Sequence, residues 1–412
     1  MQFANIVGQQ EVKTRLKEMV YNNRLSHALL FLGREGCGAL PLAIAFAQYI
    51  LCEKINPPAK SSKEIALFGE EKNPAQPLMR EDVCGECASC LKSLQLIHPD
   101  LHFSYPAIKK DSKHDRVLST DYIREWREFV RQFPYGNVVD WINFLKESPT
   151  AKIESPVNKQ GNITVQECDD ISHKLSLKAF ESPYKILIMW MPEFLGNSGN
   201  KLLKLIEEPP PDTLFIFVAE DEAAILPTIL SRLQLIKIPS LQDKDIVQAL
   251  TGKYEVAQER AVKISAIAEG NFREALILLE DIEEDWQAEV RAWLNVTLKN
   301  NVNAQLKWID EISRIGREKQ KQFLRYFIHL LQQAIRVRYL NDADLSSVPD
   351  DEKDFAHRLN NMCGLEAQEA IIKELDKAIY YIERNAHAKM LFHALTIRFL
   401  HIIKDNSLFL VN

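Results

Sequence analysis

The second half of the chain has almost none of the residues that interrupt helices. Of the 18 prolines and 14 glycines among 412 residues, 17 prolines and 10 glycines fall in residues 1–239, which leaves Pro349 and four glycines for the rest. Because both residue types disfavour helix interiors, we expect residues 240–412 to be nearly all α-helical and residues 1–239 to be mixed. Hydrophobic residues make up 46% of the chain, which is enough for two or three cores and excludes a disordered or fibrous protein.

Long apolar runs and an excess of basic residues are also missing. The run from Ile186 to Pro192 is far shorter than the ~18 residues of a membrane-spanning helix, and residues 1–5 carry no basic segment followed by an apolar one. The net charge of −6 argues against a general nucleic-acid coat, which needs excess lysine and arginine to displace counterions. We therefore expect a soluble, cytoplasmic protein with no membrane partner.

Seven cysteines without an export signal argue against a disulfide framework. Cys84, Cys87 and Cys90 follow one another at C-x₂-C spacing, and Cys52 precedes them. Thiolates at this spacing can surround one tetrahedral Zn²⁺, and a fourth cysteine leaves no open coordination position. The sequence thus predicts a structural zinc site, with an iron–sulfur cluster or metal-free reduced thiols as alternatives. The remaining cysteines are isolated and are expected to be packing residues: Cys37, Cys168 and Cys363.

Three apolar segments predict buried strands, over residues 29–32, 185–190 and 213–219. Helical spacing follows the first of them over residues 41–51. A second helix, over residues 199–208, separates the other two strands. Strand, helix and strand in this order imply a parallel α/β sheet.

Two segments interrupt this α/β pattern. Residues 53–83 are rich in proline, lysine and glutamate and suggest a solvated excursion. Residues 104–160 form either a folded insertion or a set of core aromatics that cover the sheet, and the helical spacing of their aromatic residues favours the second interpretation. These aromatics are Trp126, Phe129, Phe133, Trp141 and Phe144.

Beyond Pro239 the pattern predicts a small helical unit to about residue 281 and then a longer helical domain. Three apolar stripes at helical spacing support the longer domain. They are Phe323, Phe327, Leu330, Ala334 and Val337; Ile371, Leu375, Ile379 and Ile382; and Leu391, Leu395, Phe399 and Ile402.

Residues 33–40 have the glycine frame of a phosphate-binding P-loop, G-x-x-x-x-G-K-S/T, between a predicted strand and a predicted helix. Gly33, Gly36 and Gly38 allow backbone N–H groups to turn toward phosphates. The lysine that would contact the β- and γ-phosphates is replaced by Ala39, and the hydroxyl that would bind Mg²⁺ is replaced by Leu40. The loop therefore lacks both the cation and the metal ligand of a nucleotide site.

The second predicted strand lacks nucleotide chemistry as well. Phosphoryl transfer requires an aspartate for Mg²⁺ near the end of this strand, often followed by a glutamate that orients water. Trp190 and Met191 stand there, and Glu193 follows only after Pro192. We predict no functional ATP site and no enzymatic activity of this chain by itself.

Several segments, taken in order, resemble one protein family. They are residues 3–9, 25–33, the cysteine module with His98-Pro99-Asp100, and residues 200–210, 226–232 and 270–276. Together they resemble the delta-prime subunits of the bacterial DNA polymerase III clamp loader, which are relatives of AAA+ ATPases. The resemblance covers residues 1–282 and continues weakly at 385–389. It departs at Leu233, where the family's Ser-Arg-Cys motif has cysteine, and in the long gap that separates Cys52 from the other three cysteines.

The resemblance implies an α/β plus all-α fold with three parts. Residues 1–239 would form an AAA+ P-loop-type parallel sheet core with the cysteine module (52–90) as a zinc-binding insert and an insertion at about 104–160. Residues 240–282 would form a helical lid, and residues 283–412 a helical collar for oligomerisation. The apolar stripes of that last part are equally explained by a bundle folded within one chain.

The resemblance also implies a non-hydrolysing subunit that helps load a sliding clamp onto primed DNA. Its partners would be gamma/tau and delta subunits, with the clamp and DNA reached through the complex. Arg232 occupies the family's arginine-finger position and would act on a neighbour's γ-phosphate, the alternative being a surface arginine in a local salt bridge. Arg273 matches the second sensor, where contact with nucleotide or a lid-to-core ion pair is equally consistent with the sequence.

Two other functions compete with this one. An active gamma/tau-type ATPase is opposed by Ala39, Leu40, Trp190 and Met191. A zinc-containing nucleic-acid binder outside replication is opposed by the acidic charge balance.

Overall fold

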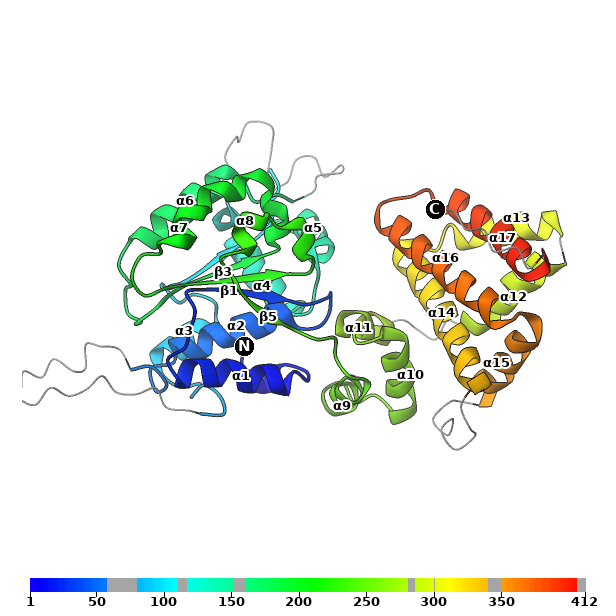
Figure 1. The fold of residues 1–412 in the computed structure, drawn as a ribbon, viewed down its shortest axis with the longest axis horizontal. Helices are drawn as coiled ribbons and strands as arrows, with labels where there is room; N and C mark the ends of the chain where they lie inside the picture. The colour runs from blue at the N-terminus through cyan, green and yellow to red at the C-terminus, as the bar shows by residue number, and fades with distance from the viewer. Residues whose placement is uncertain are drawn as a thin grey trace, which may run out of the picture. The chain divides into compact units, whose positions relative to one another are not determined.

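The computed structural model describes residues 1–57, 80–109, 117–151, 161–280, 286–299, 301–339 and 350–405. The chain divides into two compact units, residues 1–276 and 277–412, each with its own hydrophobic core (Figure 1). Within the described ranges, no helix combines the length and the apolar character needed to cross a bilayer.

The first unit is built on a parallel five-stranded sheet in the order β2-β3-β4-β1-β5. The strands are β1 (Ala28–Leu32), β2 (Leu101–Ser104), β3 (Lys185–Trp190), β4 (Thr213–Ala219) and β5 (Gln234–Lys237). β3 and β4 have the predicted bounds, and β1 begins one residue earlier than predicted. The short strands β2 and β5 at the two edges were not predicted.

Both faces of the sheet are buried. Successive residues of a strand point to opposite faces, so Leu29 and Phe31 of β1 join one core cluster while Ala28 and Leu30 join another. Figure 1 shows α1 and α2 on one side of the sheet and α6 and α7 on the other. This double burial explains why the central strands are continuous apolar runs in the sequence. The helices around the sheet are α1 (Gln10–Tyr21), α2 (Ala39–Leu51), α3 (Ala88–Leu94), α4 (Ile123–Gln132), α5 (Val138–Glu147), α6 (Val165–Ser176), α7 (Leu203–Glu207) and α8 (Pro227–Leu230).

The described part of residues 104–160 belongs to the core of the sheet. Trp126 of α4 and Trp141 of α5 are fully buried in the same cluster as the strands. The Trp126 ring stacks on Tyr105 with the centroids 4.1 Å apart and lies 5.3 Å from that of Trp190 on β3. Phe129 belongs to the same cluster and Phe144 packs against it, so this part of the segment covers the sheet. The prediction is wrong for Phe133, which is 45% exposed. Residues 110–116 and 152–160 lie outside the described residues, as do 58–79 of the predicted excursion.

The predicted helix over residues 199–208 is wrong in its first half. A 3₁₀ segment, η4 (Pro192–Leu202), precedes α7, and the α-helix covers only Leu203–Glu207. Gly196 has non-helical backbone angles within η4, where φ is 47° and ψ is −139°. Glycine adopts such angles without a Cβ clash, and they separate the turn after β3 from the α-helix.

Three helices form the predicted small helical unit: α9 (Asp243–Lys253), α10 (Gln258–Ala268) and α11 (Phe272–Glu280). The first unit extends to residue 276 and so contains α9, α10 and the first part of α11 together with the sheet. Residues 281 and 282, the predicted end of the lid, are not among the described residues.

The second unit is all α-helical. Its helices are α12 (Trp286–Leu298), α13 (Val302–Ile312), α14 (Arg317–Tyr339), α15 (Asp350–Met362), α16 (Leu365–Glu383) and α17 (Ala388–Asp405). The three predicted apolar stripes lie on α14, α16 and α17 and pack into the core of the unit. The bundle within one chain therefore accounts for them. A parallel α/β core followed by an all-α region confirms the predicted fold class.

Candidate metal centre and phosphate-loop site

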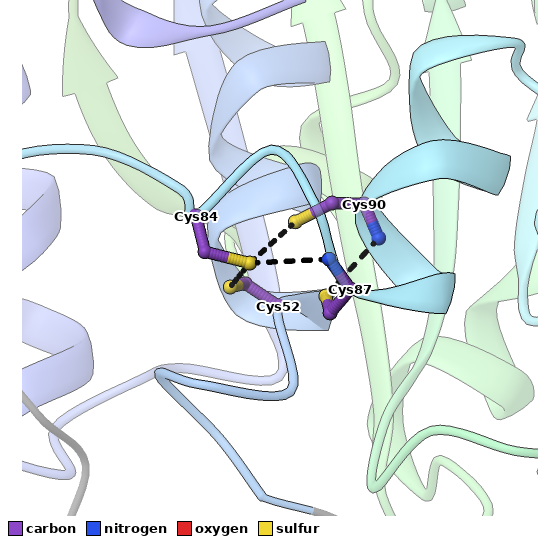
Figure 2. Close-up of side chains that lie close together, drawn as sticks. All are labelled: Cys52, Cys84, Cys87 and Cys90. Atoms are coloured by element: carbon purple, nitrogen blue, oxygen red, sulfur yellow. Dashed lines mark hydrogen bonds between the residues drawn. The ribbon is translucent and has the colours of Figure 1, made fainter.

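The four predicted metal ligands lie together. Cys52 follows the last residue of α2, Cys84 lies in the loop before α3, Cys87 is the N-cap of α3, and Cys90 belongs to its first turn (Figure 2). All four Sγ atoms lie within 4.8 Å of one another. Cys52, which lies far from the other three cysteines in the sequence, is fully buried inside this group.

The sulfur spacing fits one tetrahedral ion. Four sulfurs at zinc–sulfur distances of ~2.3 Å would lie ~3.8 Å apart along the edges of the tetrahedron. The Cys52 and Cys84 Sγ atoms are 3.7 Å apart, and those of Cys84 and Cys90 are 3.8 Å apart. Sulfurs this close would suit a single central ion, whereas a multi-iron cluster would need a wider spacing.

Backbone geometry holds the sulfurs in place. Gly85 has a φ of +74°, which turns the chain between Cys84 and Cys87. The amides of Cys87 and Cys90 donate to the Sγ atoms of Cys84 and Cys87, both at 3.4 Å. A hydrogen bond from the Cys90 thiol lowers the pKa of Cys52 to about 5, while the pKa of Cys90 is raised. The group thus favours one thiolate by itself, and a bound cation would stabilise all four.

The His98-Pro99-Asp100 segment is structural. The Asp100 carboxylate accepts backbone N–H groups from Phe180, Glu181 and Ser182, and its own amide donates to Nδ1 of the buried His98. These bonds join the start of β2 to the loop before β3. A carboxylate with three amide donors is strongly held, so this motif ties neighbouring strands together.

The predicted phosphate loop joins β1 to α2, and its frame is intact. Gly36 and Gly38 have φ values of +71° and +89°, and Gly38 is the N-cap of α2. The cavity at this loop is only about 30 Å³, whereas small-molecule sites typically measure ~300–1,000 Å³. Trp190, Met191 and Tyr135 line it together with Ala39 and Leu40. Large apolar and aromatic side chains therefore occupy the space beside the loop.

Glu193 supports the backbone at the end of β4. Its Oε1 accepts the amides of Glu220 at 2.6 Å and Asp221 at 3.0 Å, and burial raises its pKa. A glutamate that orients attacking water would have to present its carboxylate to the site. One carboxylate oxygen of Glu193 instead accepts hydrogen bonds from two backbone amides.

Arg273 forms the lid-to-core ion pair that the sequence left open. Its side chain is only 8% exposed and contacts both oxygens of Asp140 on α5, with Nη2 2.6 Å from Oδ1. Its Nη1 lies 3.2 Å from Oε1 of Glu35 in the phosphate loop. Asn137 and Asn271 also donate to Glu35, at 2.9 and 3.2 Å. Two carboxylates of the chain, Asp140 and Glu35, thus hold the Arg273 guanidinium.

Arg232 lies two residues after the end of α8 and contacts Glu207 of α7. Its Nε donates to Oε1 of Glu207 at 2.7 Å, and its Nη2 contacts the same oxygen. Its Nη1 donates to the Thr228 carbonyl at 2.5 Å. The side chain is 33% exposed, so the guanidinium is oriented within its own chain and is still open to solvent.

The three isolated cysteines are packing residues, as predicted. All are buried, and burial raises the pKa values of the Cys37 and Cys168 thiols to about 12. Such thiols stay protonated and unreactive near neutral pH.

Known proteins match both the first unit and longer parts of the chain. A family model described as DNA polymerase III, delta subunit, matches residues 8–75 and 64–242. The DNA polymerase III subunit delta' of Bacillus subtilis is 25% identical over 244 residues, 58% of this chain and 51% of that protein. The subunit tau/gamma of Haemophilus influenzae is 26% identical over 285 residues, 68% of this chain and 30% of that protein. The chain thus spans about half or less of the length of these relatives.

Solved structures also align. A DNA polymerase III gamma subunit-related protein from Thermotoga maritima aligns with a TM-score of 0.36 and 11% identity, over 94% of this chain and 98% of that one. The DNA clamp loader delta protein of Bacillus subtilis aligns with a TM-score of 0.25 and 13% identity, over 75% and 98%. The family model, in contrast, covers more than half of the sequence, from residue 8 to residue 242. The chain therefore belongs to the DNA polymerase III delta subunit family.

Proposed function

We propose that this chain is a non-hydrolysing, delta-prime-type subunit of the cytoplasmic DNA polymerase III clamp loader. In this role it helps load the sliding clamp onto primed DNA and offers Arg232 to the ATP site of a neighbouring subunit. Its direct partners are gamma/tau and delta subunits, and the clamp and DNA are reached through the complex. Family membership supports the replication role.

The filled phosphate-loop site carries the non-hydrolysing part of the proposal. A cavity of about 30 Å³ is roughly a tenth of the smallest typical ligand site of ~300 Å³. Ala39 and Leu40 offer neither a cation for phosphates nor a ligand for Mg²⁺. Arg273 is held by Asp140 and Glu35, and the nearby Glu35 carboxylate disfavours a triphosphate by like-charge repulsion.

The cysteine site has a structural role in this proposal. Zn²⁺ held by Cys52, Cys84, Cys87 and Cys90 would have four protein ligands and no open position for substrate or water. It would fasten the end of α2 to α3. Zinc contributes no chemistry to ATP hydrolysis here.

Arg232 acts on a neighbour's nucleotide. An arginine placed near a γ-phosphate stabilises the negative charge that develops during phosphoryl transfer, an effect of ~10³–10⁵ in kcat in other systems. The exposed guanidinium after α8 supports this role, because it is oriented by Glu207 and Thr228 while remaining open to solvent.

The decisive experiment reconstitutes the complex with gamma/tau and delta subunits and compares wild type with Arg232→Ala. We expect assembly to be unchanged, measured by size-exclusion chromatography, and clamp-stimulated ATPase to fall by at least about ten-fold because one transition-state cation is lost. Lys204→Ala is the matched control, since Lys204 is an exposed cation on the neighbouring helix α7. Equal ATPase rates for wild type and Arg232→Ala would refute the arginine-finger role.

An active gamma/tau-type ATPase is the second candidate, because tau and gamma/tau subunits are 22–26% identical to the chain over up to 68% of its length. Calorimetric titration of the isolated chain with ATP and Mg²⁺ separates the two functions. We expect no binding heat up to millimolar ATP. Saturable binding at micromolar ATP, with hydrolysis by the isolated chain, would favour the second candidate.

A further inference from the structure

We propose that Glu207 is a positioning residue for Arg232: it fixes the guanidinium in the orientation that serves a neighbouring nucleotide. This inference rests on the proposed function of Arg232 as an arginine finger. It adds a second residue to that role, at the end of α7 and 25 positions earlier in the chain.

Glu207 and Thr228 hold two different edges of the guanidinium. Oε1 of Glu207 accepts from Nε at 2.7 Å and contacts Nη2. The Thr228 carbonyl accepts from Nη1 at 2.5 Å, and the Ser231 hydroxyl lies 3.1 Å from the same nitrogen. Because the guanidinium is planar, contacts on two of its edges define both the direction of the side chain and the rotation of its plane.

Both supports are themselves anchored. Glu207 is the last residue of α7, directly after the fully buried Ile206. Thr228 lies in α8, next to the fully buried Ile229. The buried side chains fix the two short helices against the same core cluster. The orientation of Arg232 is thus built on the core, although the guanidinium lies at the surface.

Glu207 positions the arginine and does not withhold it. The carboxylate is 45% exposed and carries one charge, so its attraction for the guanidinium is weakened by solvent. A γ-phosphate carries more negative charge and binds arginine through charge-assisted hydrogen bonds, so it can displace the Glu207 carboxylate from the Nη2 edge of the guanidinium. The main effect of Glu207 is to restrict the rotation of a long side chain before the neighbour arrives, which reduces the entropy lost on engagement.

The test measures ATPase of the reconstituted complex with four new variants of this chain, beside wild type and Arg232→Ala. Glu207→Ala should lower kcat about three- to ten-fold without changing the KM for ATP, because orientation is lost while the finger remains. Glu207→Gln, which keeps an acceptor oxygen, should fall between Glu207→Ala and wild type. Glu208→Ala is the matched control, since Glu208 is the next residue, is exposed, and has no ion-pair partner in the described ranges.

The fourth version, Glu207→Ala combined with Arg232→Ala, identifies the route of the effect. If Glu207 acts through Arg232, the double variant should match Arg232→Ala alone. An additional loss in the double variant would overturn the inference, and so would a rate for Glu207→Ala equal to that of Glu208→Ala. A rate above wild type would show that Glu207 withholds the finger, which also contradicts the proposal.

A second measurement does not depend on the complex. The Nε–H group of Arg232 should show restricted motion in nitrogen-15 relaxation of the free chain, and Glu207→Ala should release it. Unchanged relaxation would overturn the positioning role. If Arg232→Ala leaves the ATPase unchanged while relaxation responds to Glu207→Ala, the finger function fails and the orientation by Glu207 stands as a structural fact alone.

Discussion

The cysteine site and the phosphate loop lie in the same unit, and residue spacing predicts both. They differ in whether the side chains that would do the chemistry are present. At the cysteine site every donor atom is present, and the fold brings the four sulfurs within 4.8 Å of one another. At the phosphate loop the glycines keep the backbone frame, whereas Ala39 and Leu40 replace the functional side chains. Glycine spacing therefore indicates a backbone shape, and only the donor residues indicate the chemistry.

The phosphate-loop frame still has a structural use. The Phe272 amide at the start of α11 donates to the Gly36 carbonyl at 3.1 Å, so the lid joins the loop directly. Gly36 has a φ of +71°, and a Cβ there would lie 1.8 Å from Oδ1 of Asn271, so the Asn271 side chain would have to move for any other residue. Glu35 completes the contact through Arg273 and Asn271. The loop therefore contacts Asn271, Phe272 and Arg273 at the start of α11.

Removing one ligand from the cysteine site is expected to have the largest effect. Cys90→Ser should abolish stoichiometric zinc, measured by elemental analysis, and lower the Tm of the first unit by about 10 °C, because metal binding contributes directly to folding. Hydrogen exchange should accelerate in α3. Chelation of the wild-type protein should produce the same changes.

Cys168→Ala is the matched control for the cysteine site, since it changes a buried cysteine of the same unit outside the sulfur cluster. It should retain full zinc content. Zinc bound in full by Cys90→Ser, or a Tm unaffected by chelation, would show that the four cysteines are not a structural metal site. In that case the cysteine site, like the phosphate loop, would have a motif's spacing without its chemistry.

Arg273→Ala tests the second site through its lid contact. The substitution removes the guanidinium that contacts both Glu35 and Asp140, and we expect a loss of about 2 kcal/mol because both carboxylates are partly exposed. Hydrogen exchange in α9 and α10 should accelerate with no ATP present. The exposed Lys263→Ala on α10 is the control and should leave exchange unchanged. Equal exchange in both variants would mean that the ion pairs do not hold the lid.

How much the sequence predicts depends on how locally each feature is encoded. β3 and β4 have the predicted bounds because burial on both faces makes them uninterrupted apolar runs. β2 and β5 are four residues long and include His102, Gln234 and Lys237, so no apolar run indicates them. Both strands exist because they pair with a strand already in the sheet, which is a tertiary effect.

The two sites follow the same rule. Cysteine spacing predicts the metal ligands because three of the four lie within seven residues. Arg273 and Asp140 are 133 positions apart in the sequence. Nothing in the residues around either one indicates which residue it pairs with. The sequence showed that the metal ligand was missing, but it did not show that Trp190 and Met191 line a cavity of only about 30 Å³.

The smallest effect is expected from restoring the missing side chains of the phosphate loop, and this change tests whether their loss alone prevents ATP binding. Restoring the motif with Ala39→Lys and Leu40→Thr together returns both missing functional groups to the frame. We nevertheless expect no ATP binding by calorimetry up to millimolar concentration. The reason is that Trp190, Met191 and Tyr135 still line a cavity of about 30 Å³, and Glu35 still engages Arg273. Thermal unfolding of the variant serves as the control for folding. Micromolar ATP binding by the folded variant would mean that the loop lost only two side chains, whereas its absence means that the volume for the nucleotide was lost with them.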